Sequence, residues 1–172
     1  KGYLFSIAHA NTVISTMWYR TDLLKNAGIA MPKTWDEMLA LTEQIKSDGD
    51  APWCVGIESG AATGWPATDW MEEIMLRTTS LENYDKWVKG ELPFNSPEVK
   101  HAAEVLGELW LTEGNVYGGQ PSIVSTNFGD APAPMFEQPP KCWLHKQGNF
   151  ITGFFPTDAV ADEDYAFFYL PP

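Results

Sequence analysis

The chain of 172 residues carries a formal net charge of -12, from 23 acidic against 11 basic residues, and 44% of its residues are hydrophobic. That length fits one domain with a full hydrophobic core. The negative charge repels phosphate backbones and anionic lipid surfaces, so it argues against nucleic acid or an anionic membrane as a partner. The sequence has no apolar run near the roughly 20 residues that a bilayer-spanning helix needs.

Strand-like and helix-like patterns alternate along the first half of the chain. Expected elements are strands at 3–8, 13–19 and 52–57, and helices at 21–27, 35–47, 67–78 and 81–88. In the 35–47 helix, five residues fall on one apolar face: Trp35, Met38, Leu39, Thr42 and Ile45.

The second half begins with the clearest helix signal. Ser96 is a good N-cap, Pro97 suits the first helical position, and Glu98 complements the helix dipole. An apolar stripe follows at Val99, Ala102, Ala103, Leu106, Leu109 and Trp110. Glycines and prolines are frequent in the segments that follow. The elements expected there are a helical piece at 122–128, short extended runs at 133–136 and 142–144, an acidic turn at 158–164 and a last strand at 165–170. Short strands interleaved with helices predict an α/β (α+β) fold.

Residues 18–39, WYRTDLLKNAGIAMPKTWDEML, form the most informative segment. An aromatic strand end runs into a short helix that stops at Gly28, a residue suited to the left-handed cap. Pro32 prevents a direct restart of the helix. Thr34 and Glu37 then have the spacing of a capping box, which predicts the start of a second helix.

This order of pieces resembles the signature of the sugar-binding extracellular solute-binding proteins of ABC transporters, solute-binding family 1. The later segments GAATGWPATDWMEEIMLR and NFGDAPAPMFEQPPKCWLHKQGNF are most similar to the α-glucoside-binding members. The resemblance covers nearly the whole chain. It implies one lobe of a two-lobed, periplasmic-binding-protein-like II fold. Two such lobes close on a sugar, and the closed form docks on a membrane permease.

The resemblance also implies how the chain is organised. Residues 1–172 are expected to be a single domain, the central or C-terminal lobe of a two-lobed protein, with the first lobe absent. Both ends of the sequence read as interior sequence, KGYLFSIAHA and DYAFFYLPP, so we expect a fragment of a longer protein. Such proteins are periplasmic, or extracellular as membrane-anchored lipoproteins.

Two tryptophans, Trp65 and Trp143, stand in Gly- and Pro-rich connections. A loop aromatic can stack on the apolar face of a sugar ring while nearby polar groups bind the hydroxyls, although such rings also plug the ends of domains. The resemblance places Thr63, Gly64 and Trp65 at the cleft between lobes and makes Trp143 a stacking residue.

Two further polar residues are candidates for the sugar site. Asp69, one turn into a helix, is able to accept two sugar hydroxyls or simply to complement the helix dipole. Asn11, in the polar bend at 9–12, either faces the cleft or has a plain turn role.

Cys54 and Cys142 are the two cysteines of the chain. An even count permits a disulfide in an oxidising compartment, and two buried thiols are the alternative. The sequence has no Cys-x-x-Cys and no cluster of Cys and His, so neither zinc nor another cofactor is expected.

An enzyme is the main alternative, because an acidic chain with loop tryptophans also describes a glycoside hydrolase with paired carboxylates. In a chain with 23 acidic residues, however, some pairing arises by chance. Glu72 and Glu73 read as a solvated helix face, and the three histidines are scattered and read as structural or solvent-facing. A protein-interaction module is the second alternative. The carboxylates that could supply the catalytic pair of such a hydrolase are Glu58, Asp69, Glu72, Glu73 and Glu137. We conclude that non-catalytic binding of an oligosaccharide, of the α-glucoside type, explains the sequence best.

Overall fold

The computed structural model describes residues 12–172. The strand expected at 3–8 and the candidate Asn11 lie outside the described residues. Four strands are present in this part of the chain: β1 (Thr16–Arg20), β2 (Ala51–Trp53), β3 (Cys142–Lys146) and β4 (Tyr165–Tyr169). The α-helices are α1 (Thr21–Asn26), α2 (Trp35–Ser47), α3 (Trp65–Thr78), α4 (Leu81–Val88), α5 (Pro97–Leu111) and α6 (Gly119–Ser125). Short 3-10 helices are η1 (Gly60–Ala62), η2 (Ala133–Phe136) and η3 (Asn149–Phe154).

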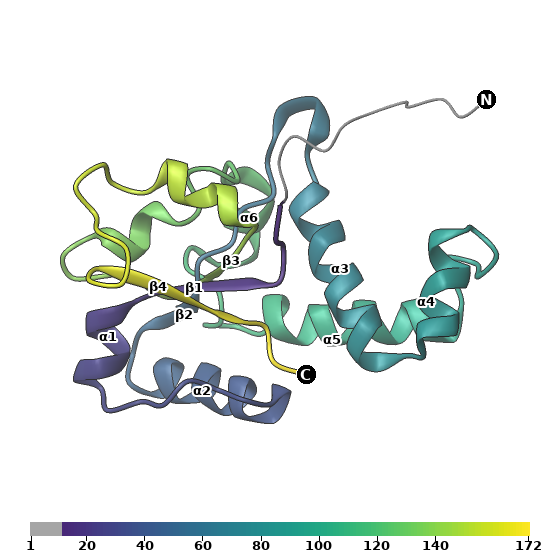
Figure 1. Ribbon diagram of the computed structural model, residues 1–172, viewed down its shortest axis with the longest axis horizontal. Coiled ribbons are helices and arrows are strands. Elements are labelled where there is room, and N and C mark those ends of the chain that lie inside the picture. Colours follow the sequence, from purple (N-terminus) through teal and green to yellow (C-terminus); the bar gives the residue numbers. More distant parts are fainter. Residues whose placement is uncertain (1–11) are drawn as a thin grey trace, which may run out of the picture.

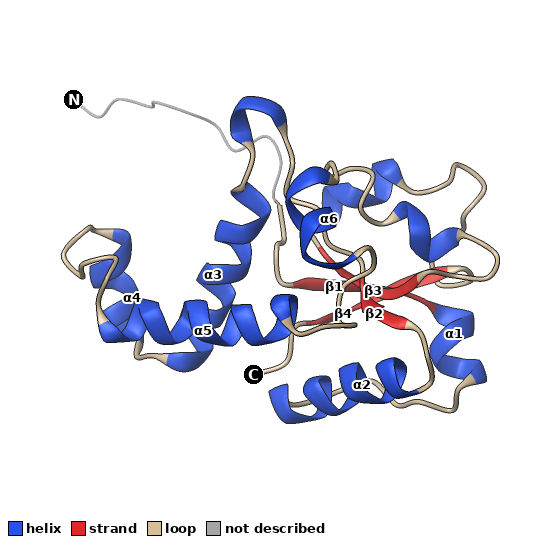
Figure 2. Ribbon diagram, turned by 180° about the vertical axis from the view of Figure 1, so that it is seen from behind, coloured by secondary structure: helices blue, strands red, loops and turns tan. Residues whose placement is uncertain are grey.

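One mixed sheet organises these elements in the order β2-β3-β1-β4. Strand β1 is antiparallel to both β3 and β4, with Trp18 opposite His145 on one side and Phe167 on the other. Strand β2 runs parallel to β3. In Figure 1, α1 and α2 lie below the sheet and α6 above it, while α3, α4 and α5 form a group at one side. Figure 2 shows the same layers from behind.

Three tryptophans join the sheet to this side group of helices. Trp70 of α3 makes edge-to-face contacts with Trp53 of β2 and Trp110 of α5, at ring-centroid distances of 5.6 and 5.9 Å. All three are buried. Edge-to-face aromatic pairs add about 0.5–1.5 kcal/mol each beyond the area they bury. The main core therefore continues from the sheet into α3 and α5.

The start of α2 follows the predicted capping pattern in part. The Thr34 hydroxyl accepts a hydrogen bond from the Glu37 backbone N–H at 3.2 Å, as the spacing indicates. The Glu37 carboxylate, however, accepts from the backbone N–H of Lys33 at 2.6 Å, one residue before the N-cap. Both contacts still satisfy backbone donors that a helix start would otherwise leave unpaired.

Several sequence expectations about local structure are wrong. The strand expected at 52–57 is confined to β2, because after Cys54 the backbone donors of Ile57 and Glu58 bond to carbonyls at the α6 end, not to β3. The extended run expected at 133–136 is the 3-10 helix η2. On α2, Leu41 rather than Leu39 is buried, because the buried stripe is Met38, Leu41, Thr42 and Ile45 and Leu39 lies to one side of it.

Cys54 and Cys142 form a disulfide, with their Cα atoms 5.4 Å apart and 88 residues between them in sequence. Both are buried, and the bond joins the residue after β2 to the first residue of β3. It therefore closes the long connection that carries α3, α4, α5 and α6, and it links the end of β2 to the start of β3.

Reduction of this disulfide is expected to destabilise the fold. Closing a loop of 88 residues contributes about 4–5 kcal/mol in the chain-entropy model. Urea unfolding of the Cys54→Ala/Cys142→Ala variant is expected to give a free energy of unfolding lower by about that amount. Addition of a reductant lowers the stability of the wild type and leaves the variant unchanged. Equal stability of the two proteins in the oxidised state would contradict the expectation.

Candidate functional site

Four aromatic rings gather at the N-terminal end of α3. Trp65 lies 5.2 Å from Phe128 and 5.8 Å from Phe150, centroid to centroid, and Phe128 lies 5.4 Å from Phe154. Phe150 and Phe154 are 38% and 49% exposed, and the other two rings are half-buried. We call these four residues the aromatic patch. It is a partly exposed apolar surface made of rings from three separate segments.

Backbone features bring the rings together. Trp65 is the first residue of α3, and Gly64 before it is the N-cap, with a left-handed φ of 103° that favours glycine. Pro66 occupies the first turn of the helix, as the sequence predicts. At Gly129 a Cβ atom would lie 2.5 Å from the Phe154 ring, so only glycine permits this close approach.

A carboxylate and an amide lie beside the patch. Glu58 accepts hydrogen bonds from Asn127 Nδ2 at 2.7 Å and from the Gly60 backbone N–H at 2.5 Å. The hydrogen bond from Asn127, followed by that from Gly60, lowers the pKa of the Glu58 carboxyl. Glu58 and Asn127 also pair through a backbone bridge, which puts them next to Phe128. The carboxylate is therefore ionised, fixed in position and able to accept further hydrogen bonds.

Thr63 and Gly64 belong to the exposed turn that precedes Trp65. The Thr63 hydroxyl accepts from the Ser59 N–H at 3.0 Å and donates to the Gly60 carbonyl at 2.8 Å. Gly64 donates its N–H to the Ile57 carbonyl at 2.9 Å. Both residues thus hold the turn in shape and lie beside Trp65.

Asp69 lies one helical turn after Trp65 and is half-buried. Burial raises the pKa of its carboxyl, the Lys146 ammonium opposes that rise, and the charges of Glu72 and Glu73 add to it. Lys146 is itself buried, with its Nζ 5.2 Å from the centroid of the Trp70 ring. A buried ammonium therefore lies near the carboxylates of α3 that follow Trp65.

Glu73 differs from its expected position on a solvated helix face. Its side chain is 4% exposed and forms an ion pair with Arg77, Oε2 to Nη1, at 2.6 Å. The other carboxylate oxygen accepts a hydrogen bond from the Ser15 hydroxyl. A one-turn spacing of Glu and Arg on a helix is common on surfaces, so the spacing does not indicate that Glu73 is buried.

Trp143 does not lie in a loop near the aromatic patch. It is the second residue of the central strand β3, is 9% exposed and packs in the main core, and its Nε1 donates to Asp50 at 3.0 Å. That burial leaves no open face for a sugar ring. Phe150, seven residues later, and Phe154 are the exposed aromatics that follow this strand, and the sequence signal for Phe150 is the polar QGNF segment with Gly148.

The remaining candidates are separated from one another. Glu137 is exposed near the Arg20 end of β1, where its carbonyl accepts from Arg20, whereas Asp69 lies near Lys146 at the opposite end of that strand. His145 is buried, and burial lowers its pKa to about 4. Its Nδ1 lies 2.9 Å from the Cys54 carbonyl, so this histidine is structural, as expected.

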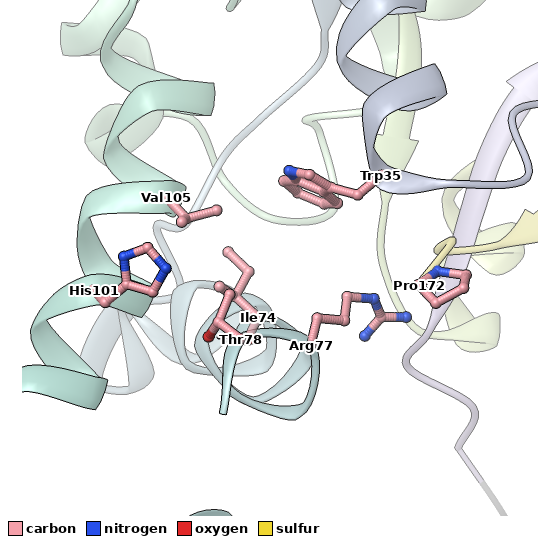
Figure 3. Close-up of a pocket in the computed structure, with 7 residues that line it drawn as sticks. All are labelled: Trp35, Ile74, Arg77, Thr78, His101, Val105 and Pro172. Atoms are coloured by element: carbon pink, nitrogen blue, oxygen red, sulfur yellow. Dashed lines mark hydrogen bonds between the residues drawn. The ribbon is translucent and has the colours of Figure 1, made fainter. Parts of the chain in front are cut away.

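A separate cavity of about 250 Å³ lies at the other end of α3. Figure 3 shows its lining: Trp35, Ile74, Arg77, Thr78, His101, Val105 and Pro172. None of the sugar-site candidates lines it. Within residues 12–172, no cluster of three or more His, Cys, Asp or Glu is arranged to hold a metal ion. No helix of this part of the chain has the length and apolar character to cross a bilayer.

The model of the family described as bacterial extracellular solute-binding protein matches residues 8–170 of the chain. The chain therefore belongs to this family of solute-binding receptors, which are not enzymes. Membership places the protein outside the cytoplasmic membrane, in the periplasm or the extracellular space.

Two relatives are similar over almost the whole chain. The alpha-glucosides-binding periplasmic protein AglE of Rhizobium meliloti is 48% identical over 169 residues, which are 98% of this chain and 37% of AglE. The osmoprotective compounds-binding protein GgtB of Synechocystis sp. is 44% identical over 171 residues, 99% of this chain and 40% of GgtB. The chain thus spans about two fifths of the length of these relatives.

Solved structures agree with the fold. The bacterial solute receptor AcbH, described with a preference for β-D-galactopyranose, superposes with a TM-score of 0.77 at 20% identity, over 93% of this chain and 37% of AcbH. A chitin oligosaccharide binding protein gives 0.73 at 23% identity, over 90% of this chain and 37% of that protein. These likenesses show that the chain has a periplasmic-binding-protein-like α/β fold, as the sequence predicts.

The buried Lys146 gives a pH-dependence that is open to test. Burial lowers its pKa from 10.5 to about 8, so the unfolded state binds more protons between these values. The free energy of unfolding therefore rises with pH across that window, by up to about 3 kcal/mol at 1.36 kcal/mol per pKa unit. Urea unfolding from pH 8 to 10.5 is expected to show the wild type gaining this stability relative to Lys146→Met.

The exposed Lys89 offers a matched control. The same titration of Lys89→Met is expected to run parallel to the wild type at every pH. If Lys146→Met also ran parallel to the wild type, the ammonium of Lys146 would not be desolvated in the folded protein.

Proposed function

We propose that the protein binds an oligosaccharide of the α-glucoside type without chemical change and delivers it to the membrane permease of an ABC transporter. The observation that carries this proposal is the aromatic patch beside fixed polar groups. Flat, partly exposed rings suit the apolar face of a sugar, while the ionised Glu58 accepts hydroxyl hydrogen bonds. Family membership supports solute binding as the class of function.

The residues have distinct proposed roles. Trp65 and Phe150 stack on the sugar ring, because both belong to the aromatic patch and come from different segments. Asp69 and Glu58 accept hydrogen bonds from sugar hydroxyls, and the turn at Thr63 and Gly64 positions Trp65 and offers polar groups at its edge. Trp143 is not included, since its ring is buried in the core.

We further propose that residues 1–172 are one lobe of a two-lobed protein and that a second lobe completes the site. The share of the relatives that the chain spans, about two fifths, supports this division. The patch is also open on the side away from the core, as the exposure of Phe150 and Phe154 indicates. An α-glucoside is proposed because AglE, named for such ligands, is 48% identical to the chain.

Titration of the complete protein with maltose, sucrose and trehalose tests the proposal. We expect micromolar or tighter binding of at least one sugar, and a loss of about tenfold or more in affinity for Trp65→Ala or Phe150→Ala, about 1.4 kcal/mol or more. Phe94→Ala is the matched control, because Phe94 is 75% exposed and lies in the turn after α4. That variant is expected to bind as the wild type does.

Two results would contradict the proposal. Failure of the complete protein to bind any saccharide would exclude sugar transport. Hydrolysis of a nitrophenyl glucoside, lost in Asp69→Asn, would favour an enzyme instead.

We also expect residues 1–172 alone to bind sugar weakly or not at all, because half of the cleft is absent. Micromolar binding by this fragment would contradict the proposal that it holds only half of the sugar site.

A further inference from the structure

A buried network connects α3 to two neighbouring segments of the chain. Glu73 accepts a hydrogen bond from the Ser15 hydroxyl and forms the ion pair with Arg77. Arg77 donates from Nε to the Pro171 carbonyl at 2.8 Å and from Nη2 to the Leu170 carbonyl at 2.5 Å. One Glu–Arg pair on a single helix thus holds the segment before β1 and the segment after β4.

The two segments are also joined to each other. Leu170 donates its backbone N–H to the Ser15 carbonyl at 2.8 Å, which continues the β1–β4 pairing beyond both strands. Pro172 accepts from the Trp35 N–H at 2.8 Å, at the start of α2. In Figure 3, Arg77 points from α3 toward Pro172. The two segments therefore meet α3 at one point and in a fixed relative position.

The other end of α3 carries the proposed sugar contacts. Trp65 is twelve residues before Arg77, about 18 Å along a helix that rises 1.5 Å per residue. Between them, Trp70, Ile74 and Met75 are buried in the core, so the helix is held along its length. Trp65 and the Glu73–Arg77 pair therefore lie on one helix that the core holds in place.

Stability alone does not explain this pair. Burying two charges requires their desolvation, and well-packed apolar residues in the place of a buried ion pair are often as stable or more so. Apolar residues cannot form directional hydrogen bonds. The planar guanidinium, by contrast, fixes two carbonyls and a carboxylate in one geometry. The geometry, rather than the energy, is the distinctive property of the pair.

We infer that Glu73 and Arg77 are positioning residues that set the angle at which segments 12–15 and 170–172 leave this lobe, and thereby couple sugar contact at Trp65 to lobe closure. This inference rests on the proposed function, with these segments as the connections to the second lobe. Neither residue belongs to the aromatic patch. The pair acts by holding both connections against the helix whose first residue is a proposed sugar contact.

Arg77→Lys in the complete protein tests the inference, because lysine keeps a charge opposite Glu73 but cannot hold both carbonyls. We expect the sugar-free variant to have a larger radius of gyration by small-angle X-ray scattering, because the lobes are no longer held at one angle. Its affinity for the α-glucoside is expected to fall by about fivefold or more, the lower range of couplings between sites. Glu73→Gln is the second variant, and we expect the same two changes.

Lys86→Met is the matched control, since Lys86 and Glu82 form an i,i+4 ion pair on α4 that is exposed and distant in sequence from both connections. It is expected to leave scattering and affinity unchanged. A lowered melting temperature of Arg77→Lys with unchanged sugar-free scattering would overturn the inference and assign the pair a purely structural role. If the wild type bound no sugar, the proposed function would fail, whereas the sugar-free scattering would still decide whether the pair sets the lobe angle.

Discussion

The edge-to-face cluster of Trp53, Trp70 and Trp110 is the contact on which the position of the candidate site depends. It is the place where the sheet, α3 and α5 share one core, and each ring comes from a different element. Because protein interiors are close-packed, displacement of Trp70 would move the whole helix. The position of Trp65 at the start of α3 is therefore set by contacts of buried residues further along the helix.

Helix α3 consequently links two regions that differ in character. Its first residue belongs to a partly exposed aromatic patch, where binding requires an accessible surface. Its last turns carry a largely buried ion pair, whose geometry is fixed by hydrogen bonds from Arg77 to two backbone carbonyls. Lys146 lies between the two, above Trp70, and its ammonium partly balances the carboxylates of this region. The helix thus runs from the proposed sugar contacts to the proposed lobe connections.

Sequence reasoning succeeded where local signals decide structure. The helix at 35–47 and the N-cap Ser96 are confirmed, because caps, prolines and apolar periodicity act within a few residues. It failed where packing between residues far apart in the sequence determines which side chains are buried. Trp143 was expected in a loop, yet pairing of β3 with β1 and β2 buries it, and Glu73 was expected in solvent. The aromatic patch was found only at Trp65, since Phe128 and Phe150 join it through tertiary contacts.

A crystal structure of the complete protein with a bound α-glucoside is the most direct test of the central claim, that sugar binds at the N-terminal end of α3. We expect a sugar ring in van der Waals contact with Trp65 or Phe150, with a hydroxyl donating to Glu58 or Asp69. A sugar bound instead in the cavity lined by Trp35 and His101, with the aromatic patch unoccupied, would contradict it.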